Sequence, residues 1–181
     1  MSHKNITVKE KVKKSFDTLK SDFKYKNKLQ APMIKRVVVT TTTGSIKDPK
    51  KKELMLDRLT KITGQKPVVT IAKKSIAGFK LRAGDASGYK VTLRGDRMWS
   101  FLDKVVNIAF PRTKDFRGIP ATGIDDMGNF SFGIKEHTVF SETSDENIQD
   151  VFGLGATVVT TSKTKEETKA LLDIMGFLFK K

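Results

Sequence analysis

The chain has 181 residues, which is enough for one domain with a buried core. Its 35 lysines and arginines outnumber its 20 aspartates and glutamates, so the formal charge is +15. This balance favours a polyanionic partner, with nucleic acid as the first candidate and an anionic membrane surface as the second. The absence of cysteine excludes a disulfide framework and thiolate metal sites.

Metal, membrane and secretory signals are also missing from the sequence. His3 and His137 lie far apart in sequence and form no metal-ligand pair, so we expect no metal or other cofactor. No apolar run approaches the roughly 20 residues of a membrane span. The lysine-rich N-terminus lacks the apolar segment of a secretory signal. We therefore expect a cytoplasmic protein.

Taken in chain order, residues 6–23 are predicted to form an amphipathic helix, with Thr7 and Glu10 forming a capping box at its start. Its apolar stripe should pack on a sheet edge or on another helix. Its lysine face is open to two interpretations, a solvated face or an RNA site. The stripe comprises Val8, Val12, Phe16, Leu19 and Phe23.

Residues 34–42 are β-branched almost throughout and predict a strand. Asp48 and Pro49 then open a helix that ends near residue 62. The lysines in its first turn oppose the helix dipole, a cost that a bound phosphate would offset, although a solvated turn is the alternative. On the strand, Val37 and Val39 share one face, whereas Arg36, Val38, Thr40 and Thr42 share the other.

Residues 67–72 and 88–95 predict the two strands of a β-hairpin. In the second strand, Tyr89, Val91 and Leu93 alternate with Lys90, Thr92 and Arg94.

The connection 73–88 is too long for a tight turn, and loops of that length are usually functional or disordered. Cations around a flexible aromatic tip suit a phosphate backbone and a stacked base, although a solvated lysine-rich loop is the alternative. We expect this loop to be mobile alone and ordered only against a partner. Its candidate residues are Lys73, Lys74, Phe79, Lys80 and Arg82.

The remaining elements alternate helix and strand. Residues 96–109 predict a helix with Asp96 as its N-cap and Pro111 as its terminator. Strands are predicted near 128–135 and 155–162, and a last helix covers 165–175. Residues 136–150 carry acids but no lysine or arginine, so this surface should face away from RNA and could meet a basic protein.

These elements predict an α+β fold in a single domain of residues 1–181. An antiparallel sheet would be covered by helices on one face. The other face, with Lys90, Thr92 and Arg94, would stay open for RNA, and the long basic hairpin loop would extend from it.

Several motifs in order resemble one family. The chain is similar, from about residue 12 to residue 179, to the bacterial large-subunit ribosomal protein five family, the 5S-rRNA-binding proteins of the central protuberance. The motifs are Gly64-Gln65-Lys66-Pro67 and the segments 73–82, 90–98, 111–118, 128–136 and 160–164.

The resemblance implies a structural role in the large ribosomal subunit. Such proteins hold 5S rRNA on the open sheet face and help attach it to 23S rRNA. They reach the peptidyl-site tRNA with the long loop, here residues 73–88, and touch the small-subunit head through ribosomal protein thirteen; other central-protuberance proteins are further partners. The 5S-binding positions that match are Gln65, Thr92 and Arg94, with Lys90 beside them and Thr40 in the strand 34–42.

The chain departs from the family pattern at three places. Thr40-Thr41-Thr42-Thr43 replaces Asn-Met-Gly-Val, so a hydroxyl stands at Thr40 where the family has an amide that can make a paired contact. The loop ends in Ala86-Ser87-Gly88-Tyr89 rather than Pro-Ile-Gly-Cys. The small-subunit-facing end also differs, at residues 140–143 and 151–153.

Two other function classes remain as alternatives. A nucleic-acid-processing enzyme would need a carboxylate cluster, and the adjacent pair Asp125–Asp126 is better explained by turn chemistry. A membrane-surface protein could use the first helix, but that helix needs its apolar stripe for the core.

Overall fold

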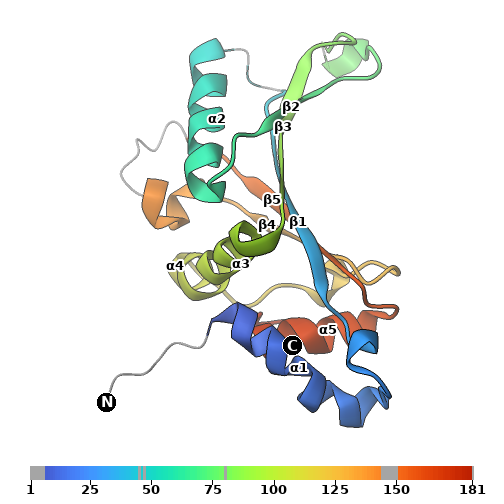
Figure 1. Ribbon diagram of the computed structural model, residues 1–181. Coiled ribbons are helices and arrows are strands. Elements are labelled where there is room, and N and C mark those ends of the chain that lie inside the picture. The colour runs from blue at the N-terminus through green and yellow to red at the C-terminus, as the bar shows by residue number, and fades with distance from the viewer. Residues whose placement is uncertain (1–6, 45, 47, 80, 144–150, 181) are drawn as a thin grey trace.

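The computed structural model describes residues 7–44, 46, 48–79, 81–143 and 151–180. A five-stranded antiparallel sheet forms its centre, with strand order β2-β3-β1-β5-β4 (Figure 1). Each strand lies within about two residues of its expected bounds, the scatter usual for such predictions. The strands are β1 (Ile34–Thr42), β2 (Val68–Ile71), β3 (Ala86–Leu93), β4 (Phe130–Ile134) and β5 (Leu154–Thr160).

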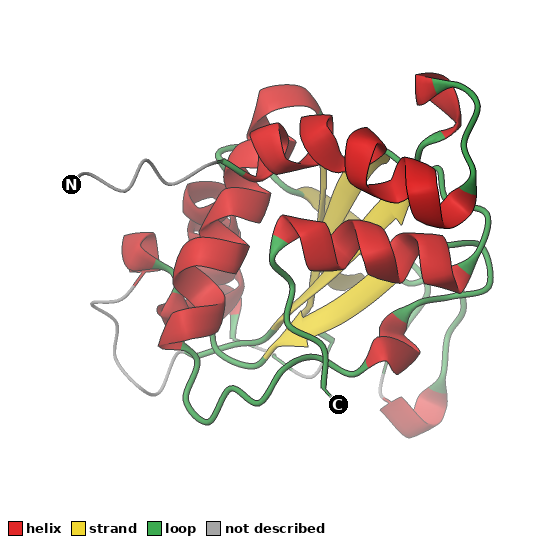
Figure 2. Ribbon diagram, turned by 90° about the horizontal axis from the view of Figure 1, so that it is seen from below, coloured by secondary structure: helices red, strands yellow, loops and turns green. Residues whose placement is uncertain are grey.

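Helices cover one side of this sheet, which confirms the α+β prediction (Figures 1 and 2). Helices α2 and α3 lie against its middle, and α1 and α5 lie side by side. The bounds are α1 (Val8–Phe23), α2 (Pro49–Thr63), α3 (Gly95–Lys104), α4 (Phe110–Arg112) and α5 (Lys165–Met175).

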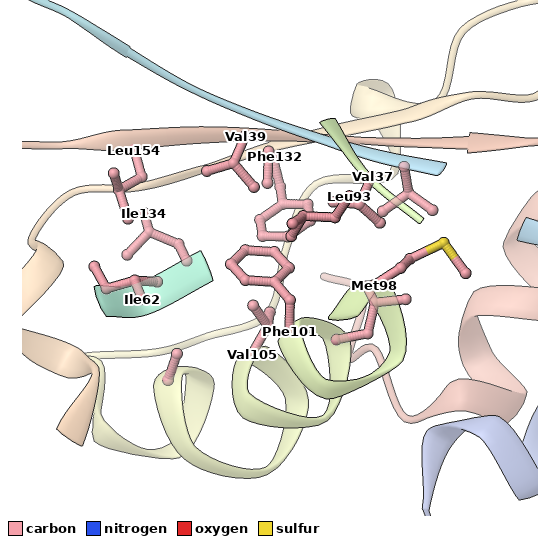
Figure 3. Packing of buried hydrophobic residues seen from close by; sticks show 14 of the residues in the cluster. Val37, Val39, Ile62, Leu93, Met98, Phe101, Val105, Phe132, Ile134 and Leu154 are labelled. Carbon is pink, nitrogen blue, oxygen red and sulfur yellow. The ribbon is translucent and has the colours of Figure 1, made fainter. Parts of the chain in front are cut away.

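The period-two pattern of the strands divides the sheet into two chemically different faces. On the covered face, Val37 of β1 pairs with Leu93 and Val158, and all three are fully buried. Phe101 of α3 packs into the same cluster from the helix layer (Figure 3). The opposite face, called the open face below, comprises Arg36, Val38, Thr40, Thr42, Val68, Thr70, Gly88, Lys90, Thr92, Ser131, Gly133, Gly155, Thr157 and Val159.

The first helix uses its apolar stripe as expected. Val8 and Leu19 are buried, and Phe16 and Phe23 pack on a small cluster with Tyr25. Thr7 caps the helix by accepting a hydrogen bond from the Glu10 N–H. The apolar stripe of α1 therefore packs within the protein itself.

The third helix differs from the prediction at both ends. Its N-cap residue is Arg94, which makes no side-chain cap bond, and Asp96 instead pairs with Lys9 at 2.7 Å. Pro111 does not end the helical path, because residues Val105–Ala109 widen into a π-helix and α4 continues through the proline. Proline lacks an N–H and its ring clashes with the preceding turn, and the π-bulge accommodates both defects.

The hairpin loop has backbone structure of its own. Strand β3 begins at Ala86, so the connection is shorter than the predicted 73–88. Ala72 donates to the Asp85 carbonyl at 2.9 Å, and Ile76 and Leu81 form an antiparallel bridge closed by one turn of 3-10 helix at Ala77–Phe79. The described backbone is thus a second, smaller hairpin on the tip of the first.

Strand β2 is an edge strand with apolar side chains exposed on both faces. Val68 and Ile71 are 66% and 63% exposed, and Val69 is exposed as well. Exposed apolar edge strands are sites of association, and lysines commonly flank them. Here Lys66 precedes the strand and Lys73 and Lys74 follow it.

His137 is a fully buried titratable group in the turn that follows β4. Its ring stacks on Phe152 at 4.1 Å, and its Nδ1 accepts the Phe152 N–H at 3.3 Å. Burial, together with the positive charge of Arg58, lowers the pKa of His137 below its ordinary value. The folded protein therefore holds the imidazole neutral.

Gly88 allows the long hairpin to pack against β1. A Cβ at this position would lie 2.4 Å from the Thr41 carbonyl oxygen. We expect Gly88→Ala to lower the free energy of unfolding by about 1–3 kcal/mol, because the strand backbones must separate. Gly133→Ala is the matched control: its nearest atom would be 4.0 Å away, so urea denaturation should show a change within about 0.5 kcal/mol.

The buried imidazole predicts a loss of stability in mild acid. Because the pKa of His137 is lower in the folded than in the unfolded chain, its contribution is complete above pH about 6.5 and declines as pH falls below that value. We expect urea denaturation of His137→Asn to depend less on pH between 7 and about 5 than denaturation of the parent. An unchanged pH slope would contradict this account, and His3→Asn is the matched substitution.

Candidate nucleic-acid interface

The open face is organised in rows that cross the sheet. In the first row, Lys90 pairs with Thr40, Thr40 with Gly155, and Gly155 with Gly133. The Thr40 hydroxyl lies 3.4 Å from the Gly155 carbonyl oxygen. A cation and a hydroxyl therefore stand next to two positions that have no side chain.

A second row carries hydroxyl groups. Thr92 pairs with Val38, and Val38 with Thr157. Thr157 in turn pairs with Ser131, and the two hydroxyls lie 2.9 Å apart, so one donates to the other. This row offers neutral donors and acceptors beside the charged row.

The open face is cationic at the end where the chain passes from β3 into α3. Arg36 of β1 pairs with Val159 of β5, and Arg94 follows directly after β3. Both arginines are exposed. A guanidinium presents several donors in a fixed fork, which suits bidentate contacts to phosphate.

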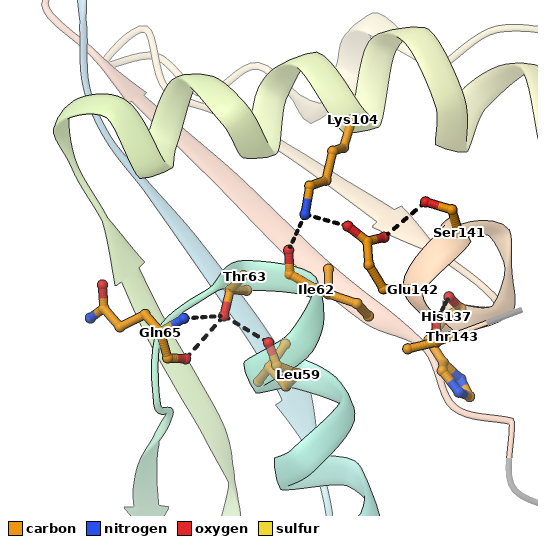
Figure 4. Close-up of polar contacts among 9 residues, drawn as sticks. All are labelled: Leu59, Ile62, Thr63, Gln65, Lys104, His137, Ser141, Glu142 and Thr143. Atoms are coloured by element: carbon orange, nitrogen blue, oxygen red, sulfur yellow. Dashed lines mark hydrogen bonds and ion pairs between the residues drawn. The ribbon is translucent and has the colours of Figure 1, made fainter.

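Three of the five predicted sheet-face residues lie together on the open face: Thr40, Lys90 and Thr92. Arg94 lies at the end of the same strand. Gln65 lies apart from them, half-buried in the connection between the C-cap Gly64 of α2 and β2. There the Thr63 hydroxyl donates to the Gln65 carbonyl at 3.1 Å, and Figure 4 shows the Gln65 side chain pointing away from that contact.

The predicted loop residues lie on the small terminal hairpin. Lys73, Lys74 and Arg82 are exposed there. Ser75 and Asp85 hold its backbone, through the Ser75 Oγ bond to the Ala83 N–H at 2.9 Å and the Asp85 carboxylate bond to the Arg82 N–H at 2.8 Å. Lys80 and the side chain of Phe79 lie outside the described residues.

The glycines of the open face line a shallow groove between β1, β5 and β4. Its volume is about 570 Å³, and Thr40, Gly133 and Gly155 are among its lining residues. Lys135 also lines it. Missing side chains allow a ligand backbone to approach the sheet closely, and the neighbouring hydroxyls and cation can then contact it.

The acidic segment contacts the helix layer rather than the open face. Lys104 of α3 forms an ion pair with Glu142 and donates to the Ile62 carbonyl at 3.2 Å (Figure 4). Burial opposes ionisation of Glu142, but Lys104 outweighs it and holds the pKa of this carboxyl below its usual value. Asp145, Glu146 and Asp150 lie outside the described residues.

Local contacts account for both members of the adjacent pair Asp125–Asp126. Asp125 accepts from the Asn129 backbone N–H at 2.6 Å and its side-chain amide at 2.9 Å, which lowers the Asp125 pKa, and Asp126 pairs with Lys165 at 2.8 Å. The described part of the chain contains no cluster of three potential metal ligands. Among the same residues, no helix is long and apolar enough to cross a membrane.

Sequence reasoning left several open-face residues out of the candidate site. The sequence does not show that four of these residues lie side by side, because this depends on the pairing of β5 with β1 and with β4. They are Ser131, Gly133, Gly155 and Thr157. The alternation within residues 129–134 and 155–161 was an available signal for the face of each strand, but not for strand order. The alternation within residues 34–42 correctly predicts the face on which Arg36 lies.

Comparison with known proteins agrees with this architecture. Residues 27–82 match the family model "Ribosomal protein L5", and residues 86–179 match the model of the C-terminus of the same ribosomal protein family. The large ribosomal subunit protein uL5 of Syntrophomonas wolfei is 50% identical over 87% of this chain and 89% of its own length. The uL5 protein of Heliobacterium modesticaldum is 46% identical over 96% of this chain and 97% of its own, and that of Ureaplasma urealyticum is 48% identical over 90% and 89%.

The two family models together cover all five strands and the helices α2 to α5, and the relative from Heliobacterium modesticaldum matches 96% of the chain. The match therefore includes β1 and β3 at the centre of the open face, and also β2, the other strand of the hairpin. On these grounds the chain belongs to the uL5 family of ribosomal proteins, non-enzymatic structural constituents of the large ribosomal subunit.

Proposed function

We propose that the open face binds 5S rRNA and helps attach it to 23S rRNA in the central protuberance. The observation that carries this proposal is the row in which Lys90 and Thr40 stand beside Gly155 and Gly133. A-form RNA presents 2′-hydroxyls and phosphates across a wide, shallow minor groove, which proteins recognise by shape and polar contacts. A flat sheet face with hydroxyls, cations and few bulky side chains matches that surface.

The charged groups and the hydroxyl groups of this face would contact different parts of the RNA. Arg36, Lys90 and Arg94 would contact phosphates, which supplies affinity that falls as salt rises. Thr40, Thr92, Thr157 and Ser131 would contact 2′-hydroxyls, which distinguishes RNA from DNA. Gln65 lies off the open face and would reach the RNA only at the β2 edge of the sheet.

We further propose that the terminal hairpin contacts the peptidyl-site tRNA. The β2–β3 hairpin extends beyond the body of the sheet, so its tip is separate from the rows of the open face (Figure 1). Lys73, Lys74 and Arg82 give it charge for a phosphate backbone. Its internal hydrogen bonds would reduce the entropy lost when it binds.

The acidic segment is the proposed contact to the small-subunit head, through ribosomal protein thirteen. Glu142 is held in place by Lys104, and Glu136 is exposed nearby. Acidic side chains on the helix side of the protein would attract a basic protein and repel RNA. Other central-protuberance proteins would contact the remaining surfaces.

The open-face proposal predicts a large effect for one arginine. Arg94→Ala should weaken 5S rRNA binding by about 1–3 kcal/mol, because a charge-assisted contact is lost. Lys169→Ala on α5 removes an equal charge from the helix side and should change affinity by much less. Filter binding at moderate salt measures both, and an unchanged dissociation constant for a folded Arg94→Ala protein would remove Arg94 from the site.

The hairpin proposal predicts separable defects. Replacing residues 73–84 with an Asn-Gly turn keeps the Ala72–Asp85 pairing that closes β2 and β3. This variant should fold and bind 5S rRNA within about threefold of the parent, since the open face is intact. Ribosomes carrying it should release peptidyl-site tRNA faster. Loss of 5S binding in the folded variant, or an unchanged tRNA off-rate, would contradict the assignment of 5S rRNA to the open face and of tRNA to the hairpin.

A further inference from the structure

A small apolar pocket lies between α1, the start of α3 and the segment 28–34 that leads into β1. Figure 1 shows α1 at the opposite end of the molecule from the hairpin. The pocket has a volume of about 220 Å³, and seven of its eleven described lining residues are apolar, with no acid among them. None of the eleven belongs to the open face or to the hairpin. The apolar walls include Val12, Phe16, Pro32, Met33, Ile34 and Trp99.

The pocket lies where two hydrophobic clusters meet. Val12 and Trp99 pack on the main core, whereas Phe16 and Ala31 belong to the smaller cluster. Helix α1 contributes to both clusters and thus forms one wall of the gap between them. Atoms that line a gap lack contacts on one side, so a side chain that fills the pocket would gain dispersion energy from every wall.

Apolar side chains are also exposed beside the pocket. Met33, which forms part of its wall, is 47% exposed, and Leu29, next to the lining residue Lys28, is 79% exposed. The backbone beneath Leu29 is well held, because it lies in a turn of 3-10 helix whose N-cap Asn27 accepts from the Leu29 N–H at 3.1 Å. Exposed apolar side chains that gather around a pocket mark sites of contact with another protein.

The rim of the pocket is cationic and partly free. Lys9 is paired with Asp96, but Lys13 and Lys28 have no ion-pair partner among the described residues. Both of these lysines are exposed. The rim can therefore attract a carboxylate without first breaking a contact within the protein.

Trp99 adds a hydrogen-bond donor to the pocket. Its side chain is half-buried, and its indole N–H has no acceptor in the part of the chain that the structure describes. Tryptophan combines a large apolar ring with one polar atom, which suits a surface that another protein covers. A carbonyl or carboxylate of that protein would accept from the indole N–H while an apolar side chain packs on the ring.

We propose that this pocket docks a segment of an acidic partner protein, in which one bulky apolar side chain is flanked by carboxylates. The apolar side chain would fill the pocket against Phe16 and Trp99. The carboxylates would pair with Lys13 and Lys28 at the rim. This inference does not depend on the RNA-binding function proposed for the open face.

Charge and size distinguish this occupant from others. RNA would pair with the lysines but would place polar sugars and phosphates against an apolar wall, where they lose hydration. A second copy of the chain would bring a net charge of +15 towards a cationic rim. The volume is below the roughly 300–1,000 Å³ of a typical small-molecule site, so a single anchoring side chain fits better.

The fluorescence of Trp99 tests the proposal directly, because it is the only tryptophan of the chain. The full-length protein is titrated with the blocked peptide acetyl-EELFEE-amide, which contains no tryptophan or tyrosine. We expect a saturable blue shift of the emission, since the apolar side chains of the peptide displace water from the indole. The peptides acetyl-EESSEE-amide and acetyl-KKLFKK-amide should bind at least about tenfold more weakly. No shift with the acidic apolar peptide, or equal binding of either comparison peptide, would overturn the proposal.

Two variants at exposed lining positions separate the apolar and the charged contributions. Met33→Ser should weaken binding of the acidic apolar peptide by about fivefold, because part of the apolar wall is lost. Lys13→Ala/Lys28→Ala should weaken it by about fivefold as well and should reduce its salt dependence.

The chain offers a matched control for each variant. Met127→Ser changes a methionine that is 76% exposed and does not line the pocket, and Lys50→Ala/Lys163→Ala removes two exposed charges elsewhere. Both controls should bind the peptide within about twofold of the parent. Equal losses in variants and controls would show unspecific attraction and would overturn the proposal.

Photo-crosslinking locates the bound peptide independently. The leucine of the acidic peptide is replaced by its diazirine analogue, and adducts are mapped by mass spectrometry. We expect adducts within residues 9–16 and 28–34 and at Trp99. Adducts confined to β2, which is also apolar and flanked by lysines, would overturn the pocket as the docking site. A Trp99 shift produced by a short uridine-rich RNA or by concentrating the protein alone, but not by the peptide, would overturn it in favour of RNA or of a second copy.

Discussion

Pairing of β1 with β3 on one side and β5 on the other is the interaction on which the rest of the structure depends. It joins residues as distant in sequence as Val39 and Ala156, so the sheet forms only when most of the chain is present. The two family models divide the chain at the hairpin, yet β1 of the first lies between β3 and β5 of the second. Neither segment contains the complete set of neighbours for β1.

The same pairing couples the core to the open face. Val39 is fully buried on one face of β1, and Thr40, the next residue, stands exposed beside Lys90 on the other. A one-residue slip would bury Thr40 and expose Val39, so the apolar core enforces the register of the open face. No further contacts are needed to orient the side chains of the open face, because the free energy of core burial already determines which side chains face outward.

The sequence predicted strands and helices well where a period or a cap is local. Val37 and Val39 identified the buried face, and Thr7 caps its helix as expected. Asp96 failed as a cap because Lys9, distant in sequence, captures its carboxylate. Pro111 does not end the helical path because the π-helix before it accommodates the proline. The contact between Ser131 and Thr157 could not be predicted, because the sequence of a single strand does not determine the order of strands in the sheet.

The exposed apolar edge at β2 has a consequence for the protein before it reaches a ribosome. Val68, Val69 and Ile71 belong to a strand whose outer edge is unpaired and could be extended by a second copy, and repulsion between the flanking Lys66, Lys73 and Lys74 opposes this. At physiological salt that repulsion is screened beyond roughly 8 Å. Molecules made in excess of their RNA should therefore precipitate or be degraded, which favours synthesis in step with ribosomal RNA.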